Sequence, residues 1–240
     1  MKLSLVIPIF NAESFILGTL NSLVEWKKNR DYQVEVILVN DGSTDVTNSI
    51  VEDFLKKDNS LKFISYSLNQ GKGHAIKTGM MTAIGEFRIF TDADLPYGLN
   101  IIDKVLYNLE FKEFDVCIGN RKSPESEYFI KMSFLRKLSS KLFTILISRY
   151  VVTGVNDTQC GLKGFKADIA DKIFSKLQIK GFAFDVEILY LSYKYELDIK
   201  RIAVTFEGNN LSTISLFKTS TTMLWDVLCL PIRYHFLKKY

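Results

Sequence analysis

The chain has 240 residues, 47% of them hydrophobic, and a formal net charge of +4 at pH 7. This length allows one large hydrophobic core, and so small a net charge gives no reason to expect nucleic acid as a partner. The three cysteines Cys117, Cys160 and Cys229 lack metal-site spacing, and their odd number argues against a disulfide framework, so we expect a reducing, cytoplasmic location. Asp226 and Arg233 interrupt the most apolar C-terminal stretch, so we expect no run of roughly 20 apolar residues to span a membrane.

The first part of the chain alternates between short β-branched runs and longer segments with helical spacing. Strands are predicted at Leu3–Ile9, Val34–Val39, Leu61–Tyr66 and Phe87–Thr91. Helices are predicted at 12–26, 45–57, 72–84 and about 99–109, followed by a strand at 115–119. Apolar strands between helices are typical of a parallel sheet with helices on both faces. We therefore predict a doubly wound α/β fold in one domain.

Polar loops follow the predicted strands at 8–13, 40–45, 69–73 and 92–94. In such sheets ligands bind beyond the carboxyl ends of the strands, so we expect these loops to meet at one binding edge. Each loop alone also reads as an ordinary turn, for example with Thr44 or Asp45 capping the next helix. Gly71-Lys72-Gly73 resembles a phosphate cradle but lacks the spacing of a Walker or dinucleotide loop, and Lys72 could simply be solvated.

The most informative loop is Asp92-Ala93-Asp94, where two carboxylates follow an apolar run. Residues i and i+2 at a strand end point to one side. Paired carboxylate oxygens suit Mg²⁺ or Mn²⁺ that keeps positions open for a phosphate-bearing substrate. The alternative is a turn in which Asp94 caps a helix, since Pro96 and Gly98 follow.

Five motifs occur in the first half of the chain: PIFNAE at 8–13, ILVNDGSTD at 37–45, NQGKGHAIKTG at 69–79, TDADLP at 91–96 and GNR at 119–121. Their order and spacing resemble the inverting family 2 glycosyltransferases with the glycosyltransferase-A fold. DTQCGLKGF at 157–165 and GFAFDVEIL at 181–189 look like the dolichyl-phosphate glucosyltransferase branch and its bacterial relatives. The resemblance covers about residues 1–206, so we expect a catalytic domain at 1–210 and an amphipathic tail at 211–240.

The resemblance implies a nucleotide-sugar site and a metal bound by Asp92 and Asp94, with Asp92 reaching the ribose or the metal. The residues implied for donor binding are Pro8, Phe10, Asn11, Glu13, Asp41, Lys72, Asp92, Ala93, Asp94 and Arg121. Phe10 offers a stacking face and Asp41 an acceptor for a base N–H, while the Arg121 guanidinium suits two-point phosphate binding. Phe10 could equally belong to the core, and Arg121 could be a solvated surface residue.

Three further acids, Asp157, Asp185 and Glu187, lie among apolar or small neighbours. Acids in segments that look buried need a partner or a function. The resemblance places them around the reacting sugar, as acceptor-side base, sugar hydroxyl contact or orienting group. Asp185 could instead be the N-cap of a helix that runs to about Tyr195, and the two roles are compatible.

A lipid acceptor is suggested by residues 128–156, which contain no acid but carry Lys131, Arg136, Lys137, Lys141 and Arg149. Apolar residues at helical spacing from 134 to 146 predict an amphipathic helix that suits the headgroup layer of a membrane, or equally a helix packed on the sheet. The stretch 223–240 combines aromatic residues with lysines, and a capping helix or a dimer contact explains it as well. Pro231 should kink or interrupt it.

Two departures from the family pattern bear on the site. Pro96 stands where polyprenyl-phosphate mannosyltransferases usually have a glutamine, so a side-chain metal ligand is lost there. After the strand predicted at 199–206, where relatives often present a cation for phosphate, no cation occurs until Lys218.

The sequence thus predicts a membrane-associated, metal-dependent enzyme that transfers a hexose, most readily glucose from UDP-glucose, to a polyprenyl or dolichyl phosphate at the cytoplasmic face. One alternative acceptor is a glycan or glycolipid hydroxyl, which would need a true general base. An alternative of another class is a non-catalytic scaffold that binds a nucleotide sugar.

Overall fold

The computed structural model describes residues 1–126, 157–207 and 216–235. Its strands are β1 (Leu3–Ile9), β2 (Val34–Asp41), β3 (Lys62–Tyr66), β4 (Phe87–Phe90), β5 (Val116–Asn120), β6 (Lys163–Lys166) and β7 (Ile199–Ala203). Its helices are α1 (Ile16–Lys28), α2 (Thr47–Leu55), α3 (Lys72–Thr82), α4 (Ile101–Glu110), α6 (Ala167–Lys176), α7 (Phe184–Lys194) and α8 (Leu216–His235). The strands and helices predicted in the first 120 residues are confirmed, with shifted ends, whereas β6 and α6 were not predicted.

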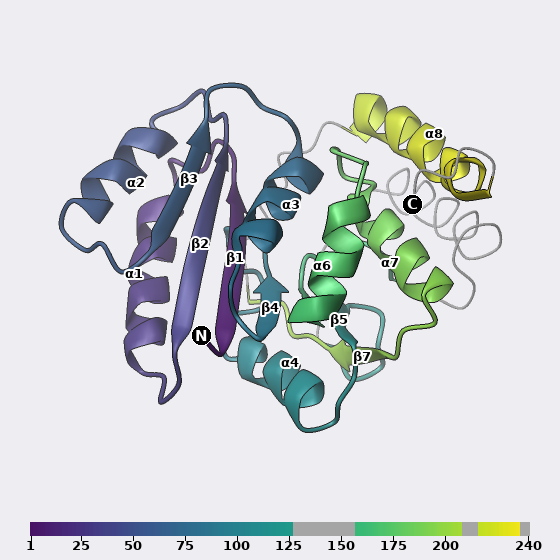
Figure 1. Ribbon diagram of the computed structural model, residues 1–240. Helices are drawn as coiled ribbons and strands as arrows, with labels where there is room; N and C mark the ends of the chain where they lie inside the picture. The colour runs from purple at the N-terminus through teal and green to yellow at the C-terminus, as the bar shows by residue number, and fades with distance from the viewer. Residues whose placement is uncertain (127–156, 208–215, 236–240) are drawn as a thin grey trace.

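The strands form one seven-stranded sheet in the order β3-β2-β1-β4-β6-β5-β7. Neighbouring strands are parallel except at β6, which runs antiparallel to both β4 and β5. The predicted α/β fold with a mostly parallel sheet is confirmed. The carboxyl ends of β1 to β4 point to one end of the molecule (Figure 1), and the polar loops leave the sheet there.

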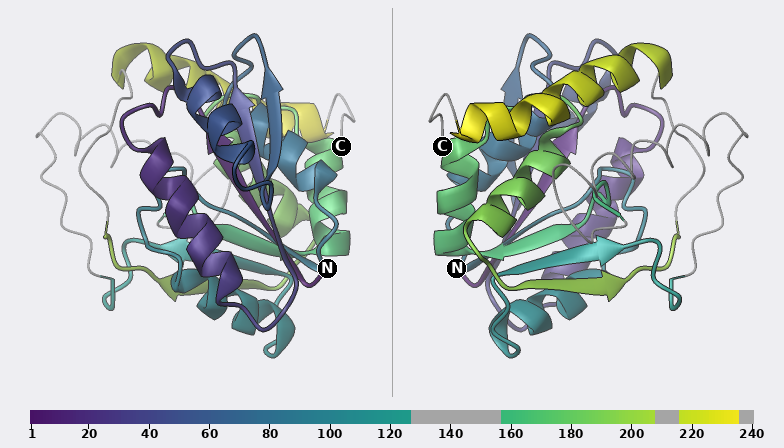
Figure 2. Two further views of the ribbon diagram at one scale, coloured as in Figure 1. Left: turned by 90° about the vertical axis from the view of Figure 1, so that its left-hand side faces the viewer. Right: turned by 90° about the vertical axis from the view of Figure 1, so that its right-hand side faces the viewer.

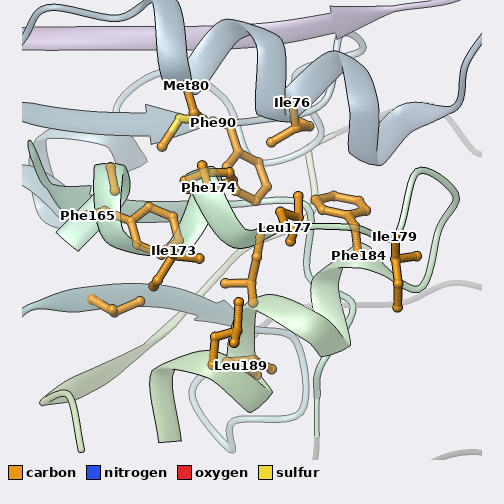
Figure 3. Packing of buried hydrophobic residues seen from close by; sticks show 14 of the residues in the cluster. Ile76, Met80, Phe90, Phe165, Ile173, Phe174, Leu177, Ile179, Phe184 and Leu189 are labelled. Atoms are coloured by element: carbon orange, nitrogen blue, oxygen red, sulfur yellow. The ribbon is translucent and has the colours of Figure 1, made fainter. Parts of the chain in front are cut away.

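Alternate residues of the central strands belong to two separate hydrophobic cores, because successive side chains of a strand point to opposite faces of the sheet. Leu3, Leu5 and Ile7 pack with α1, α2 and α4 on one face. Val6 and Phe90 pack with α3, α6, α7 and α8 on the other face, where Phe90 meets the rings of Phe165, Phe174 and Phe184 at centroid distances of 6.0 to 6.4 Å (Figure 3).

α8 packs along α7 (Figure 2), and Val227 and Leu230 of α8 are buried in the shared core. The predicted interruption at Pro231 is wrong, because α8 continues through this residue to His235. In the described part of the chain no helix has the length and apolarity to cross a membrane. The amphipathic helix predicted at 134–146 lies outside the described residues.

Candidate active site

The first two loops at the carboxyl edge are joined through Asn11 and Glu13. The Asn11 N–H donates to Ser43 Oγ at 2.9 Å, and Asn11 Oδ1 accepts from the Thr44 N–H at 2.8 Å. Glu13 accepts the Val46 N–H at 3.2 Å. Asn11 has φ of 48°, a left-handed conformation that Asn tolerates better than most residues. Asn11 and Glu13 therefore hold the second loop in place.

Phe10 is 47% exposed in this first loop. Its core alternative is therefore wrong, and its ring is available for stacking. Pro8, in contrast, is buried within β1 and is paired with Val39 of β2. It supports the loop from below.

Asp41 at the end of β2 fixes the third loop. Its two carboxylate oxygens accept the Gln70 and Gly71 N–H groups, each at 2.8 Å. The side chain is buried, and desolvation raises the pKa of Asp41 although both hydrogen bonds favour the charged form. Asp41 thus positions the segment that immediately precedes Lys72.

The amino terminus of α3 is closed by a backbone carbonyl from another segment. Lys180 O accepts the Gly73 N–H at 2.7 Å and the His74 N–H at 3.3 Å. A Cβ atom on Gly71 would lie 2.4 Å from Lys180 O, and one on Gly73 would lie 2.4 Å from Ile179 O. The glycines flanking Lys72 therefore allow close packing of residues 179–181, and at least two N–H groups of the first turn are already bonded to protein.

The acidic pair follows β4, and its two carboxylates have different surroundings. Asp92 lies against Gly161, where a Cβ would come within 2.2 Å of Asp92 Oδ2. Asp92 Oδ1 is 2.5 Å from Lys72 Nζ. This oxygen is buried, and the Lys72 ammonium is its charged partner.

Asp94 is exposed. Partial desolvation by the loops and the negative charge of Asp92 raise the pKa of Asp94. The alternative in which Asp94 caps a helix is wrong, because α4 begins only at Ile101 with Asn100 as its N-cap. Ala93 is buried between the two acids, and its carbonyl accepts the Thr19 hydroxyl of α1 at 2.8 Å.

Lys72 is not simply solvated, since its side chain is only 23% exposed. Burial opposes its charge, but the carboxylates of Asp92, Asp185 and Asp94 outweigh burial and raise the pKa of Lys72. Lys72 therefore carries its charge at neutral pH and places it between acids of the loop after β4 and of α7.

Arg121 and Asp157 form a two-point ion pair in which the carboxylate is buried and the arginine is partly buried. Arg121 Nε donates to Asp157 Oδ2 at 2.9 Å and Nη2 to Oδ1 at 2.6 Å, while the Arg121 N–H also donates to Oδ2 at 2.8 Å. Burial acts to raise the pKa of Asp157, but these hydrogen bonds prevail and lower it. Arg121 is therefore not a solvated surface residue, and Asp157 is ionised and held by it.

Asp185 pairs with Lys163 instead. Lys163 Nζ donates to Asp185 Oδ1 at 2.5 Å and to Cys160 O at 2.7 Å. Burial raises the pKa of Asp185, although Lys163 and Lys72 oppose that shift. Asp185 lies in the first turn of α7 but is not its N-cap, which is Ala183. Lys163 was not predicted as a site residue.

Glu187 has no solvent exposure. Its oxygens accept the Gln178 N–H at 3.0 Å and the Ile179 N–H at 2.7 Å. Because Lys180 follows directly and caps α3, Glu187 holds the segment that closes the amino terminus of that helix.

The arrangement suits a metal held by few protein ligands. Within the described residues no group of three His, Cys, Asp or Glu side chains could hold an ion alone. Asp92 and Asp94 offer two carboxylates from one loop, and Asp94 is exposed. Mg²⁺ commonly binds through one or two carboxylates together with water and substrate phosphates. The residues present therefore fit a cation that binds together with a diphosphate.

Known proteins resemble this chain in sequence and in fold. Enzymes named dolichyl-phosphate beta-glucosyltransferase match it at 30% identity in Dictyostelium discoideum and 31% in Homo sapiens, over 97% of this chain and 74% and 76% of theirs. Glucosyl-3-phosphoglycerate synthase from Mycobacterium tuberculosis, solved with Mn²⁺ and UDP, matches its structure with a TM-score of 0.69 at 18% identity, over 95% of this chain and 78% of the other.

The same mycobacterial enzyme has also been solved with Mg²⁺ and UDP, with a TM-score of 0.68. At such low identity these structures show that the fold is shared. Residues 4–174 match the family described as Glycosyl transferase family 2. This match covers most of the chain, including β1 to β6 and the acidic pair, and the chain therefore belongs to glycosyl transferase family 2 and is a glycosyltransferase.

Proposed function

We propose that this enzyme transfers glucose from UDP-glucose to a polyprenyl or dolichyl phosphate, with inversion at the anomeric carbon. The observation that carries the proposal is the convergence of Lys72, Asp92 and Asp94 at the carboxyl edge of the sheet. Relatives that match almost the whole chain are named for transfer to dolichyl phosphate, which supports the lipid acceptor.

The donor site is formed by the first four loops. Phe10 stacks on the base, Asn11, Glu13 and Asp41 shape the surrounding loops, and Lys72 lies near the diphosphate. Asp92 and Asp94 would hold Mg²⁺ or Mn²⁺, which, when bound, would neutralise negative charge on the leaving diphosphate. Lys72 already neutralises Asp92 at a distance of 2.5 Å. Donor binding would therefore redistribute existing charges at this edge.

The acceptor needs little activation, because a phosphate monoester has a second pKa of about 6 and is largely a dianion near neutral pH. Asp157 is ion-paired with Arg121, and Asp185 is ion-paired with Lys163. These pairings support a positioning role for both carboxylates. We infer that both carboxylates orient the sugar or the acceptor. Alignment of two anionic partners is then the main contribution of the protein.

Arg121 is the cation placed beside Asp157, and its side chain remains 26% exposed while paired. We infer that it faces a substrate phosphate from this position. Glu187, with its oxygens bound to backbone N–H groups and no exposure, acts indirectly by fixing residues 178–180.

Peripheral attachment to the cytoplasmic face of a membrane fits a lipid acceptor. Trp225, Leu228 and Ile232 of α8 are 70%, 44% and 51% exposed and recur at helical spacing. We propose that this side of α8, within the tail at 211–240, contacts the headgroup layer. A second copy of the chain at this surface is the competing arrangement, and it would appear as a homodimer in solution.

The test is transfer of label from a panel of radiolabelled sugar nucleotides to vesicles that contain polyprenyl phosphate. We expect label from UDP-glucose in a product that organic solvent extracts and mild acid cleaves. Asp94→Asn and a chelator should each abolish it, whereas Asp168→Asn, an exchange in the first turn of α6, should not. Label that enters only an aqueous polymer or a glycolipid hydroxyl would refute the lipid-phosphate acceptor.

A further inference from the structure

Lys163 is a fully buried cation in the middle of the sheet, with its side chain 1% exposed. It is the first residue of β6, the strand that runs opposite to its neighbours, and it is paired with Phe90 at the end of β4. The reversed direction of β6 brings its amino-terminal residue to the edge where β4 and β5 end. Lys163 therefore lies directly beneath the acidic loop.

The Lys163 ammonium touches three parts of the site. It donates to the Asp185 carboxylate of α7 and to the Cys160 carbonyl of the loop before β6, and it lies 5.6 Å from the centre of the Phe90 ring. Removing an ammonium group from water is strongly unfavourable unless good partners replace the water. These contacts supply such partners, and they tie α7, the 157–162 loop and β4 to a single atom.

Asp185 depends on this contact for its placement. Its side chain is 7% exposed. Within the described residues, the side-chain hydrogen bond to Asp185 comes from Lys163. Lys72 influences Asp185 through charge, but its close contact is with Asp92. Lys163 of β6 thus fixes the orientation of the Asp185 carboxylate.

We propose that Lys163 is a positioning residue that acts through Asp185, holding this carboxylate at the angle at which it meets the sugar or the acceptor. This inference rests on the proposed function, because it assigns Asp185 to the reacting partners. It predicts a defect in turnover with little change in donor binding, since the donor diphosphate lies on the side of Lys72, Asp92 and Asp94.

The experiment compares Lys163→Met, Asp185→Asn and the double variant, with kcat and KM measured for UDP-glucose and the lipid phosphate. A 1 Å misplacement of a reacting group can cost about 100-fold in rate, so Lys163→Met should lower kcat by about that factor and leave donor KM unchanged. The double variant should be no slower than Asp185→Asn alone. Lys166→Met, on the same strand but paired with Asp115, is the matched control and should keep its kcat.

Thermal unfolding separates positioning from simple support of the fold. Each single variant leaves one buried charge without its partner and should unfold at a lower temperature, whereas the double variant removes both charges and should regain stability. Positioning predicts that kcat stays low in the double variant although stability returns. Recovery of kcat together with stability, or independent and multiplying losses in kcat, would overturn the proposal.

If Lys163→Met does not fold, Lys163→Arg provides the same cycle with the charge retained. It should lower kcat in the wild-type background and have no further effect in the Asp185→Asn background. An equal effect in both backgrounds would overturn the proposal. A wild-type protein that transfers no sugar to lipid phosphate, yet binds UDP with Mn²⁺ in calorimetry, would instead refute the proposed acceptor.

Discussion

The substitution Gly73→Ala tests how closely residues 179–181 pack against the start of α3. The added Cβ would lie 2.4 Å from Ile179 O, 2.7 Å from Phe184 Cβ and 3.0 Å from Lys180 O. Two of these contacts are backbone atoms, which cannot rotate away as a flexible side chain can. Either residues 179–180 or the start of α3 must therefore move.

The size of the effect follows from three contributions. Overpacking of a tight contact costs about 1–3 kcal/mol. Weakening the hydrogen bond from Gly73 N to Lys180 O, which is 2.7 Å long, costs about 1 kcal/mol. The higher helix propensity of Ala returns up to about 1 kcal/mol. The net loss is about 1–3 kcal/mol, which lowers the melting temperature of a chain of this size by roughly 2–4 °C per kcal/mol.

The assay is urea or thermal denaturation of Gly73→Ala beside Gly18→Ala. Gly18 lies in α1, and a Cβ there meets nothing within 4 Å. The same chemical change should therefore stabilise the protein at Gly18 by about 0.5–1 kcal/mol and destabilise it at Gly73. Donor KM should also rise for Gly73→Ala, because Lys72 moves with the helix start. Equal stabilisation at both glycines would refute the close packing described for residues 179–181.

Three further substitutions test other parts of the site. Phe10→Ala should weaken UDP binding in calorimetry by about 0.5–1.5 kcal/mol without loss of stability. The control is Phe111→Ala, because Phe111 is 66% exposed at the end of α4, and it should leave UDP affinity unchanged. Equal effects on UDP affinity would argue against stacking. Asp157 has a lowered pKa in the folded protein, so its stabilising contribution is present above the ordinary value of 3.8 and is lost as the pH falls below it. Arg121→Met should lower the free energy of unfolding by about 3–5 kcal/mol at pH 7. The difference in unfolding free energy between variant and wild type, measured by urea titration, should become smaller on acidification. A difference that does not change with pH would contradict the ion-pair account. Trp225→Ala should lower the partition coefficient onto anionic vesicles, measured by sedimentation, by about ten- to a hundredfold, since burying a large apolar side chain contributes roughly 1.5–3 kcal/mol. Unchanged sedimentation would exclude Trp225 from the membrane contact.

The fold could be predicted as far as local patterns determine it. β1 was predicted with its observed ends because Leu3–Ile9 is a mostly apolar run, and such runs are typical of a central strand. The structure confirms that all seven residues are buried. β6 was missed because its four residues, Lys163–Lys166, contain a lysine at each end and a glycine. That composition is typical of a loop. Its place between β4 and β5 depends on pairing with distant segments, which no local pattern records.

The candidate site divides in the same way. Motif order drew attention to Asp92, Asp94, Asp157 and Asp185, but it could not show which cation each acid contacts. Lys163 was missed because a lone lysine is normally an exposed residue. A retrospective signal existed, since Lys163 lies in the same stretch of apolar and small residues, with Cys160, that made Asp157 look buried.

The late position of β6 in the chain also affects how the protein can be made. β4 and β5 leave the ribosome well before residues 163–166, yet each pairs with β6 along one edge. Until β6 arrives, both strands present unpaired backbone groups, which invite association with other chains. Fragments that stop before β6 should therefore be recovered as aggregates, and biosynthesis of the intact chain should benefit from chaperones that shield these edges.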